Sequence, residues 1–200
     1  MMANSGPVLF GLMEFTDGIS RDVANVPAKL IFGVSDAAEA AQQIRDAGYT
    51  FQIPGIIASD PDGYGAELLP EIEAGTDHAI VAVGLFVSDY LGSIDFYVEG
   101  LGMVAAADTG LGPFMEKVMI GAGLPHGILI MHYEDGVRRN YKDNPVKLSF
   151  TVPNAAEALI RVEAAGGTIV AQPTPVPALA DALVGVAKDL DGYTLEFVQR

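Results

Sequence analysis

The sequence predicts an α+β protein built from repeated βαβββ units, each a strand, a helix and three further strands. Two observations predict this fold class. Short apolar segments alternate with a segment whose apolar residues recur at helical spacing, and the order of these segments repeats along the chain. The clearest repeat has an offset of 118 residues, because Ala-Ala-Glu-Ala at 37–40 recurs at 155–158 and Ala-Gly at 47–48 recurs at 165–166. We therefore expect a duplicated unit.

Each copy of this unit begins with a short apolar strand, at 29–34 and at 147–152. Asp36 and Asn154 follow as helix N-caps, and a glutamate stands three residues later in both copies, as in a capping box. A glycine ends each helix. The remaining strands are expected at 50–53, 56–59 and 64–69 in the first copy, and at 168–171, 183–188 and 193–199 in the second.

A further unit of the same order lies between the two copies. We expect an apolar strand at 79–87, then a helix that begins at Ser88 and Asp89, since both residue types cap helices. Its three remaining strands are expected at 103–107, 114–120 and 128–133.

These units suggest two unequal domains. Residues 78–200 hold two complete units, whereas residues 1–75 hold one complete unit preceded by a lone strand at 8–15. A single unit cannot bury both faces of its sheet, so we expect the first part to pack as an incomplete domain or to borrow a partner chain. Exposed strand edges and an acidic surface favour a homodimer.

Charge and composition exclude several classes of partner. The chain has 26 acidic and 11 basic residues, and its net charge of −15 would repel nucleic acid and an anionic membrane surface. It has no cysteine, which excludes disulfides and cysteine-based metal sites or nucleophiles. No apolar run is long enough to span a membrane, and no basic residue precedes Arg21 as a signal peptide requires. We expect a cytoplasmic protein.

Two motifs resemble a known family. The helix segment Ser-Ile-Asp-Phe-Tyr-Val-Glu-Gly-Leu-Gly-Met at 93–103 and the closing Asp-x-Asp-Gly-Tyr-x-x-Glu at 189–196 resemble the vicinal oxygen chelate superfamily. This superfamily includes glyoxalase I, extradiol dioxygenases, fosfomycin resistance enzymes and bleomycin-binding proteins. The resemblance implies that paired units form half-open glyoxalase-like barrels around a groove, one complete at 78–200 and one incomplete at 1–75. A small, oxygen-rich molecule would bind in the groove.

The resemblance also implies where a metal ion would bind. Family members take up to four ligands from the first and last strands of the paired units, and in the complete domain these positions match Ala82, His132, Lys147 and Glu196. Alanine has no donor atom, and the lysine ammonium has no free lone pair. Only His132 and Glu196 are left to bind Fe, Mn, Ni or Zn, so we expect no cofactor, with a divalent metal as the alternative.

The incomplete domain departs from the family in the same way. Its matching residues are Glu14, Lys29 and Glu67, so a lysine again stands where a metal site has histidine. We expect a vestigial second site in which an ammonium neutralises the carboxylates in place of a cation.

The sequence leaves the function open between two classes. In a metal-free lyase or isomerase, which we favour over a dioxygenase, Lys147 paired with Glu196 and His132 would serve proton transfer. His132 would be the base, and Lys147 would stabilise an enolate or instead form a Schiff base. In a non-catalytic protein that sequesters a bulky or cationic compound, Lys147 and Glu196 would form a structural ion pair. Arg138 and Arg139 would bind an acidic group of the substrate, or belong to a solvated linker.

Overall fold

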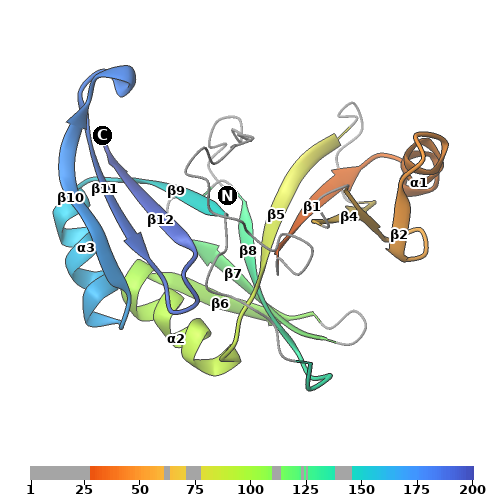
Figure 1. The fold of residues 1–200 in the computed structure, drawn as a ribbon, viewed down its shortest axis with the longest axis horizontal. Coiled ribbons are helices and arrows are strands. Elements are labelled where there is room, and N and C mark those ends of the chain that lie inside the picture. Colours follow the sequence, from red (N-terminus) through yellow and green to blue (C-terminus); the bar gives the residue numbers. More distant parts are fainter. Residues whose placement is uncertain are drawn as a thin grey trace.

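The computed structural model describes residues 28–60, 64–70, 78–109, 114–122, 124, 126–137 and 146–200. It confirms an α+β fold of βαβββ units (Figure 1). The first unit contains β1 (Ala28–Val34), α1 (Ala37–Asp46), β2 (Thr50–Ile53), β3 (Ile57–Ser59) and β4 (Gly65–Leu69). The second contains β5 (His78–Phe86), α2 (Tyr90–Leu101), β6 (Met103–Asp108), β7 (Phe114–Gly121) and β8 (Gly127–Tyr133). The third contains β9 (Lys147–Val152), α3 (Ala155–Ala164), β10 (Thr168–Val176), the 3-10 helix η2 (Pro177–Leu179), β11 (Ala182–Lys188) and β12 (Thr194–Gln199). The strand expected at 8–15 lies outside the described residues.

The expected helix caps are confirmed. The side chain of Asp36 accepts hydrogen bonds from the backbone of α1, Asp89 accepts one from α2, and Asn154 accepts one from α3. Gly102 ends α2 with a φ of 68°, a left-handed conformation that glycine adopts at low cost.

The described strands form two open sheets. The larger has eight strands in the order β2-β3-β4-β1-β5-β8-β7-β6, and the smaller has four in the order β10-β11-β12-β9. In every unit the first strand lies parallel to the last, and β1 pairs antiparallel with β5. The first and second units therefore share a sheet, whereas the sequence led us to expect that the second and third units share a barrel. The repeat identifies the units, but it carries no information on which two units join at their edges.

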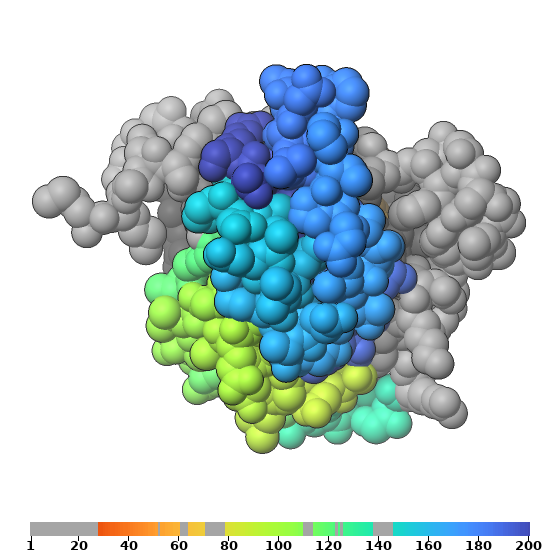
Figure 2. Space-filling view, turned by 90° about the vertical axis from the view of Figure 1, so that its left-hand side faces the viewer, coloured from red at the N-terminus to blue at the C-terminus, as the bar shows by residue number. Residues whose placement is uncertain are grey.

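The second and third units instead share the largest apolar core. Figure 2 shows α2 and α3 side by side on one face of the molecule. They approach closely at Gly100, where an added Cβ would lie 3.1 Å from the Cβ of Ala165. Fully buried side chains fill the space between these helices and the two sheets, among them Phe96, Tyr97, Leu159, Ile130 and Phe197.

The closing Asp-x-Asp-Gly-Tyr motif ties these two units together. One oxygen of Asp189 accepts hydrogen bonds from the backbone N–H of Asp191 and of Tyr193, and the other accepts one from the Tyr97 hydroxyl at 2.8 Å. Asp191 accepts a hydrogen bond from the backbone of Ser88, and the Tyr193 hydroxyl donates to the Phe86 carbonyl. The motif that carried the family resemblance is therefore structural in this chain.

This buried turn predicts a pH-dependent stability. Burial raises the pKa of Asp189 from 3.8 to about 6, so the folded protein holds this proton more tightly than the unfolded chain does. The stabilisation is complete below about pH 4 and is lost as the pH rises through about 6, a change of about 3 kcal/mol. We expect Asp189→Asn to remove this contribution. The free energy of unfolding in urea of the wild type, minus that of the variant, should therefore decrease between pH 4 and pH 7.

The control for this prediction is Asp95→Asn, which changes an exposed carboxylate on α2, the helix that carries Tyr97. The difference between that variant and the wild type should be nearly independent of pH. A difference between wild type and Asp189→Asn that stayed constant from pH 4 to pH 7 would refute the assignment.

None of the helices in the described part of the chain combines the length and the apolar character that crossing a bilayer requires.

Candidate functional site

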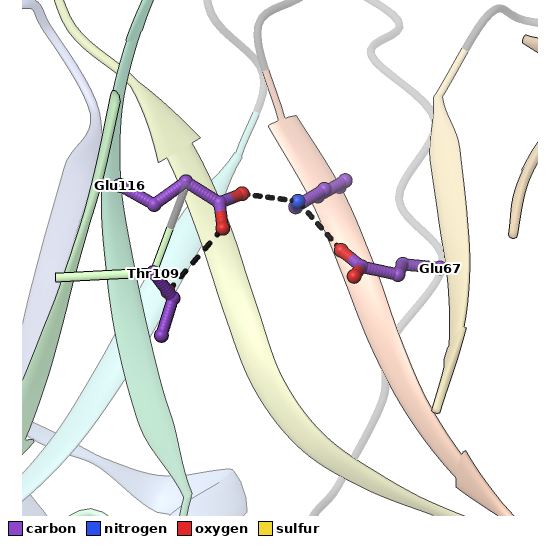
Figure 3. A network of polar contacts seen from close by, with 4 residues as sticks. Glu67, Thr109 and Glu116 are labelled. Carbon is purple, nitrogen blue, oxygen red and sulfur yellow. Dashed lines mark hydrogen bonds and ion pairs between the residues drawn. The ribbon is translucent and has the colours of Figure 1, made fainter. Parts of the chain in front are cut away.

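A buried lysine lies between two glutamates on one face of the eight-stranded sheet (Figure 3). The Nζ atom of Lys29 on β1 is 2.6 Å from Oε2 of Glu67 on β4 and 2.6 Å from Oε1 of Glu116 on β7. All three residues are at most 3% exposed. The second oxygen of Glu116 accepts a hydrogen bond from the Thr109 hydroxyl at 3.3 Å. We call Lys29, Glu67 and Glu116 the Lys29 triad.

Strand pairing and small neighbours make room for this triad. β4 and β5 flank β1, and each places a glycine against the lysine. A Cβ added at Gly84 would lie 2.8 Å from Lys29 Cγ, and one added at Gly65 would lie 2.9 Å from Lys29 Cβ, both too close for a real contact. The Nζ atom also lies 4.9 Å from the ring centre of Phe114, within the range of a cation–π interaction.

The charges of the triad do not cancel when both glutamates are ionised. Burial raises the pKa of Glu116, and the hydrogen bond and positive charge of Lys29 offset part of this rise. The contact of Glu67 Oε2 with Lys29 is an ion pair without hydrogen-bond geometry. A proton held by Glu116 would make the triad neutral, so the triad is best described as one ammonium shared by two carboxyl groups.

The same lysine–glutamate pairing recurs in the third unit. Lys147 Nζ lies 3.1 Å from Glu196 Oε2, and the Ser149 hydroxyl donates to the other oxygen of Glu196 at 2.9 Å. The expected ion pair between adjacent strands is therefore present. Unlike the Lys29 triad it is open to solvent, with the two side chains 36% and 20% exposed.

The strand register corrects the expected match of His132. In the first unit Ile31, two residues after Lys29, lies opposite Glu67. In the third unit Ser149, two residues after Lys147, lies opposite Glu196. In the second unit the corresponding residue is Gly84, and it lies opposite Leu129. Leu129, and not His132, is therefore the equivalent of the two glutamates. The two positions are three residues apart, an odd number, so the side chains of Leu129 and His132 lie on opposite faces of β8.

His132 also faces away from the Lys29 triad. Side chains alternate between the two faces along β8, so His132 lies on the same face as Ile128 and Ile130. These two isoleucines lie in the core beside α2. Its Nδ1 lies 2.9 Å from the Val87 carbonyl oxygen. Because a carbonyl only accepts, Nδ1 carries the hydrogen, and Nε2 has the free lone pair when the ring is neutral. Lys147 and Glu196 lie in the other sheet.

One member of the triad, Glu116, and its hydrogen-bond partner Thr109 were missed from the sequence. Glu116 and Thr109 have no counterpart in the repeat. The available signal was a glutamate within the apolar strand segment 114–120, a position where burial demands a partner. Glu14, Arg138 and Arg139 lie outside the described residues, so their expected roles stay predictions.

A divalent metal does not fit the residues at the paired strand positions. Of the four positions in the eight-stranded sheet, Ala82 and Leu129 have no donor atom, and Lys29 holds an ammonium against the remaining carboxylate, Glu67. In the described part of the chain, no three or more His, Asp or Glu side chains are grouped as metal ligands. Most mononuclear sites need three protein ligands.

The described part of the chain contains three βαβββ units, and two of them are joined by pairing of their first strands, β1 and β5. This architecture defines a protein of the glyoxalase-like fold class. The sequence profile of the Glyoxalase/Bleomycin resistance protein/Dioxygenase superfamily matches residues 77–197. The chain belongs to this superfamily.

Three solved structures are similar to the chain, and the fold comparison rests on the first of them alone. Glyoxalase I from Zea mays matches with a TM-score of 0.69 and 20% identity, over 86% of this chain and 66% of that one. The chain thus covers just under two thirds of that protein's length. A superfamily member from Sphaerobacter thermophilus matches with a TM-score of 0.48 and 22% identity, over 60% of this chain and 95% of that one. The antibiotic-binding protein TnmS3 from Streptomyces sp. CB03234 matches with a TM-score of 0.49 and 17% identity, over 64% and 98%. No curated protein matches the chain.

Proposed function

We propose that this chain binds a small molecule without a divalent metal, and that the ammonium of Lys29 takes the place of the cation. The observation that carries this proposal is the pair of 2.6 Å contacts from Lys29 Nζ to Glu67 and Glu116. The ammonium already pairs with both carboxyl groups that a metal ion would need, and displacing it would leave the triad with unpaired buried charge.

Burial of the triad favours binding over catalysis at this site. An ammonium that is 2% exposed and paired on two sides cannot reach a solute as a nucleophile or an acid. The neighbouring side chains on the same face are aromatic: the rings of Phe86 and Tyr133 stack with their centres 4.2 Å apart, and Phe114 packs edge-on against both. Aromatic faces suit a flat or cationic ligand, and the net charge of −15 attracts cations.

The test uses metal-free bleomycin, a cationic compound, in isothermal titration calorimetry. We expect the affinity to be unchanged by EDTA and to fall with increasing salt, since charge attraction is screened. Tyr133→Ala should weaken binding by about tenfold, the value of one aromatic contact. The control is Tyr49→Ala, which changes an exposed tyrosine of the first unit. Binding that disappears in EDTA and returns with a divalent ion would contradict the proposal.

A second candidate is a lyase or isomerase that uses His132 as general base. The hydrogen bond from Nδ1 to the Val87 carbonyl supports it, because this bond directs the basic lone pair to Nε2. The test is the exchange of the carbon-bound protons of dihydroxyacetone in deuterated water, followed by NMR. Exchange that the wild type accelerates and His132→Gln does not would support catalysis. Equal rates with and without protein would remove this carbonyl compound as a substrate and favour the binding function.

The expected participation of Lys147 and Glu196 in such a reaction stays a prediction, as does that of Arg138 and Arg139 in substrate binding. The cytoplasmic location and the homodimer are also proposals.

A further inference from the structure

Tyr133 is the ring of the aromatic cluster that a ligand can reach. Phe86 and Phe114 are each 6% exposed, whereas Tyr133 is half-buried at the end of β8. In the β7–β8 register Tyr133 lies opposite Phe114, and the uncharged Met131 lies opposite Glu116. Tyr133 is therefore on the same face of the sheet as Glu116 and diagonal to it, at about 7–8 Å.

The Lys29 triad beside this ring has one carboxyl group more than it has cations. When both glutamates are ionised, the triad has a charge of minus one, and a proton on Glu116 makes it neutral. A cation bound on Tyr133 therefore finds an opposite charge only after Glu116 has lost its proton. At an effective dielectric constant of about 20, two unit charges about 7–8 Å apart change an equilibrium by more than roughly tenfold.

Thr109 connects the buried carboxyl group of Glu116 with the surface of the protein. Its hydroxyl donates to Glu116 Oε2 at 3.3 Å, and its backbone N–H donates to the Glu116 carbonyl oxygen at 3.1 Å. Figure 3 shows this contact on one carboxyl oxygen, while the other contacts the ammonium of Lys29. Thr109 is exposed, whereas Glu116 is 3% exposed. A proton can thus pass between Glu116 and water by way of the Thr109 hydroxyl.

The charged and titratable groups near Glu116 come from three other elements. Lys29 of β1 contacts Glu116 directly, and Glu67 of β4 contacts the same ammonium. Burial is the main cause of the raised pKa of Tyr90 on α2, and the charge of Glu116 is a smaller one, so this phenol keeps its proton at neutral pH. Burial also raises the pKa of Glu116, and the hydrogen bond and charge of Lys29 offset part of this rise. We therefore place the exchangeable proton on Glu116.

We propose that Glu116 selects the ligand at Tyr133, because it loses its proton when a flat molecule with one positive charge binds there. This inference rests on the proposed binding function and names the ligand class. The O–H bond of Glu116 breaks, the proton leaves to water by way of Thr109, and the carboxylate that remains balances the charge of the ligand. A neutral ligand of the same shape leaves the proton in place. The affinity for the cation should rise with pH, whereas the affinity for the neutral molecule should not change.

The test compares 1-methylquinolinium, a flat ion with a permanent charge, with quinoline N-oxide, a neutral molecule of nearly the same shape. Because neither compound titrates near neutral pH, any proton released on binding comes from the protein. Calorimetric titration in two buffers with different ionisation enthalpies counts these protons. Between about pH 5 and about pH 8 we expect the release of up to one proton per bound cation and an affinity that rises by roughly tenfold or more. The N-oxide should show neither effect.

Two variants identify the group that loses the proton. Glu116→Gln should abolish proton release and weaken binding of the cation at about pH 8 by roughly tenfold. Thr109→Val should move the rise in affinity to higher pH, because the lost hydrogen bond stabilises the ionised form of Glu116. The matched control is Thr151→Val, which changes an exposed threonine on β9 in the other sheet and should leave the pH dependence unchanged.

The outcomes separate this inference from the proposed function. Binding of 1-methylquinolinium without proton release would overturn the inference, and so would equal affinities for the ion and the N-oxide at every pH. Proton release that persists in Glu116→Gln, or a rise in affinity that Thr109→Val does not move, would assign the proton to another group and overturn it as well. Absence of binding by 1-methylquinolinium would also overturn it, whereas the bleomycin titration tests the metal-free binding function separately.

Discussion

Replacement of Lys29 by methionine is expected to lower the free energy of unfolding by about 3–5 kcal/mol at pH 7. The variant keeps most of the side-chain volume but leaves Glu67 and Glu116 facing each other without a cation, in a place where both are buried. Two buried carboxylates without a partner are costly, because water no longer solvates them. Urea unfolding of the wild type and of the variant measures the loss.

Lys29→Met should lose less of its free energy of unfolding at acidic pH than at pH 7. Without Lys29 the pKa of Glu116, which burial already raises, loses the neighbour that lowered it. A carboxyl group with a raised pKa in the folded state stabilises the protein below its unfolded pKa, and this contribution is lost as the pH rises through the folded value. The destabilisation by Lys29→Met should therefore be small near pH 4 and grow towards pH 7.

Two controls separate charge from packing. The triple variant Lys29→Met, Glu67→Gln, Glu116→Gln removes all three charges and should recover most of the lost stability. Lys147→Met breaks the exposed equivalent of the same ion pair and should cost at most about 1 kcal/mol. Equal losses for Lys29→Met and Lys147→Met would mean that burial of the triad has no energetic consequence, and the ammonium would then not be needed to neutralise the two glutamates.

Replacement of Lys29 by histidine is expected to create a metal site. The imidazole supplies a lone pair where the lysine supplies none. The histidine side chain is shorter than that of lysine, but a metal–nitrogen bond of about 2.1 Å extends its reach towards Glu67 and Glu116. One histidine and two carboxylates make three protein ligands. Zn²⁺ at a hundredfold excess over its dissociation constant should then stabilise the variant by about 2.7 kcal/mol in urea unfolding.

The third unit again provides the matched control. Lys147→His places an imidazole beside one carboxylate, Glu196, and should gain little affinity for Zn²⁺. Glu116→Gln in the Lys29→His background should abolish the stabilisation. Stabilisation of Lys29→His that survives the loss of Glu116 would show that the metal binds at another place.

The sequence predicted most of the fold because its signals are local. The strands, the capped helices and their order follow from apolar spacing and from cap residues such as Asp36 and Asn154. Which two units share a sheet depends on which strand edges pair, and in this chain these are β1 and β5. Local sequence patterns do not predict this pairing.

The site was predicted only in part for the same reason. The pairs Lys29–Glu67 and Lys147–Glu196 each form between the first and last strands of one unit, at the positions that the family resemblance implied. Glu116 reaches the triad from another unit, so it could be recognised only after the units were paired. His132 was matched by residue type, whereas the register gives its position to Leu129.

The metal content of the wild-type protein tests the central claim most directly. The protein is purified from cells supplied with Mn, Fe, Ni and Zn, passed through gel filtration and analysed by mass spectrometry of the elements. If the Lys29 ammonium takes the place of the cation, all four metals should be far below one ion per chain. One ion per chain that disappears on Glu67→Gln would contradict the claim, since it would show that a metal ion, and not the lysine, neutralises this site.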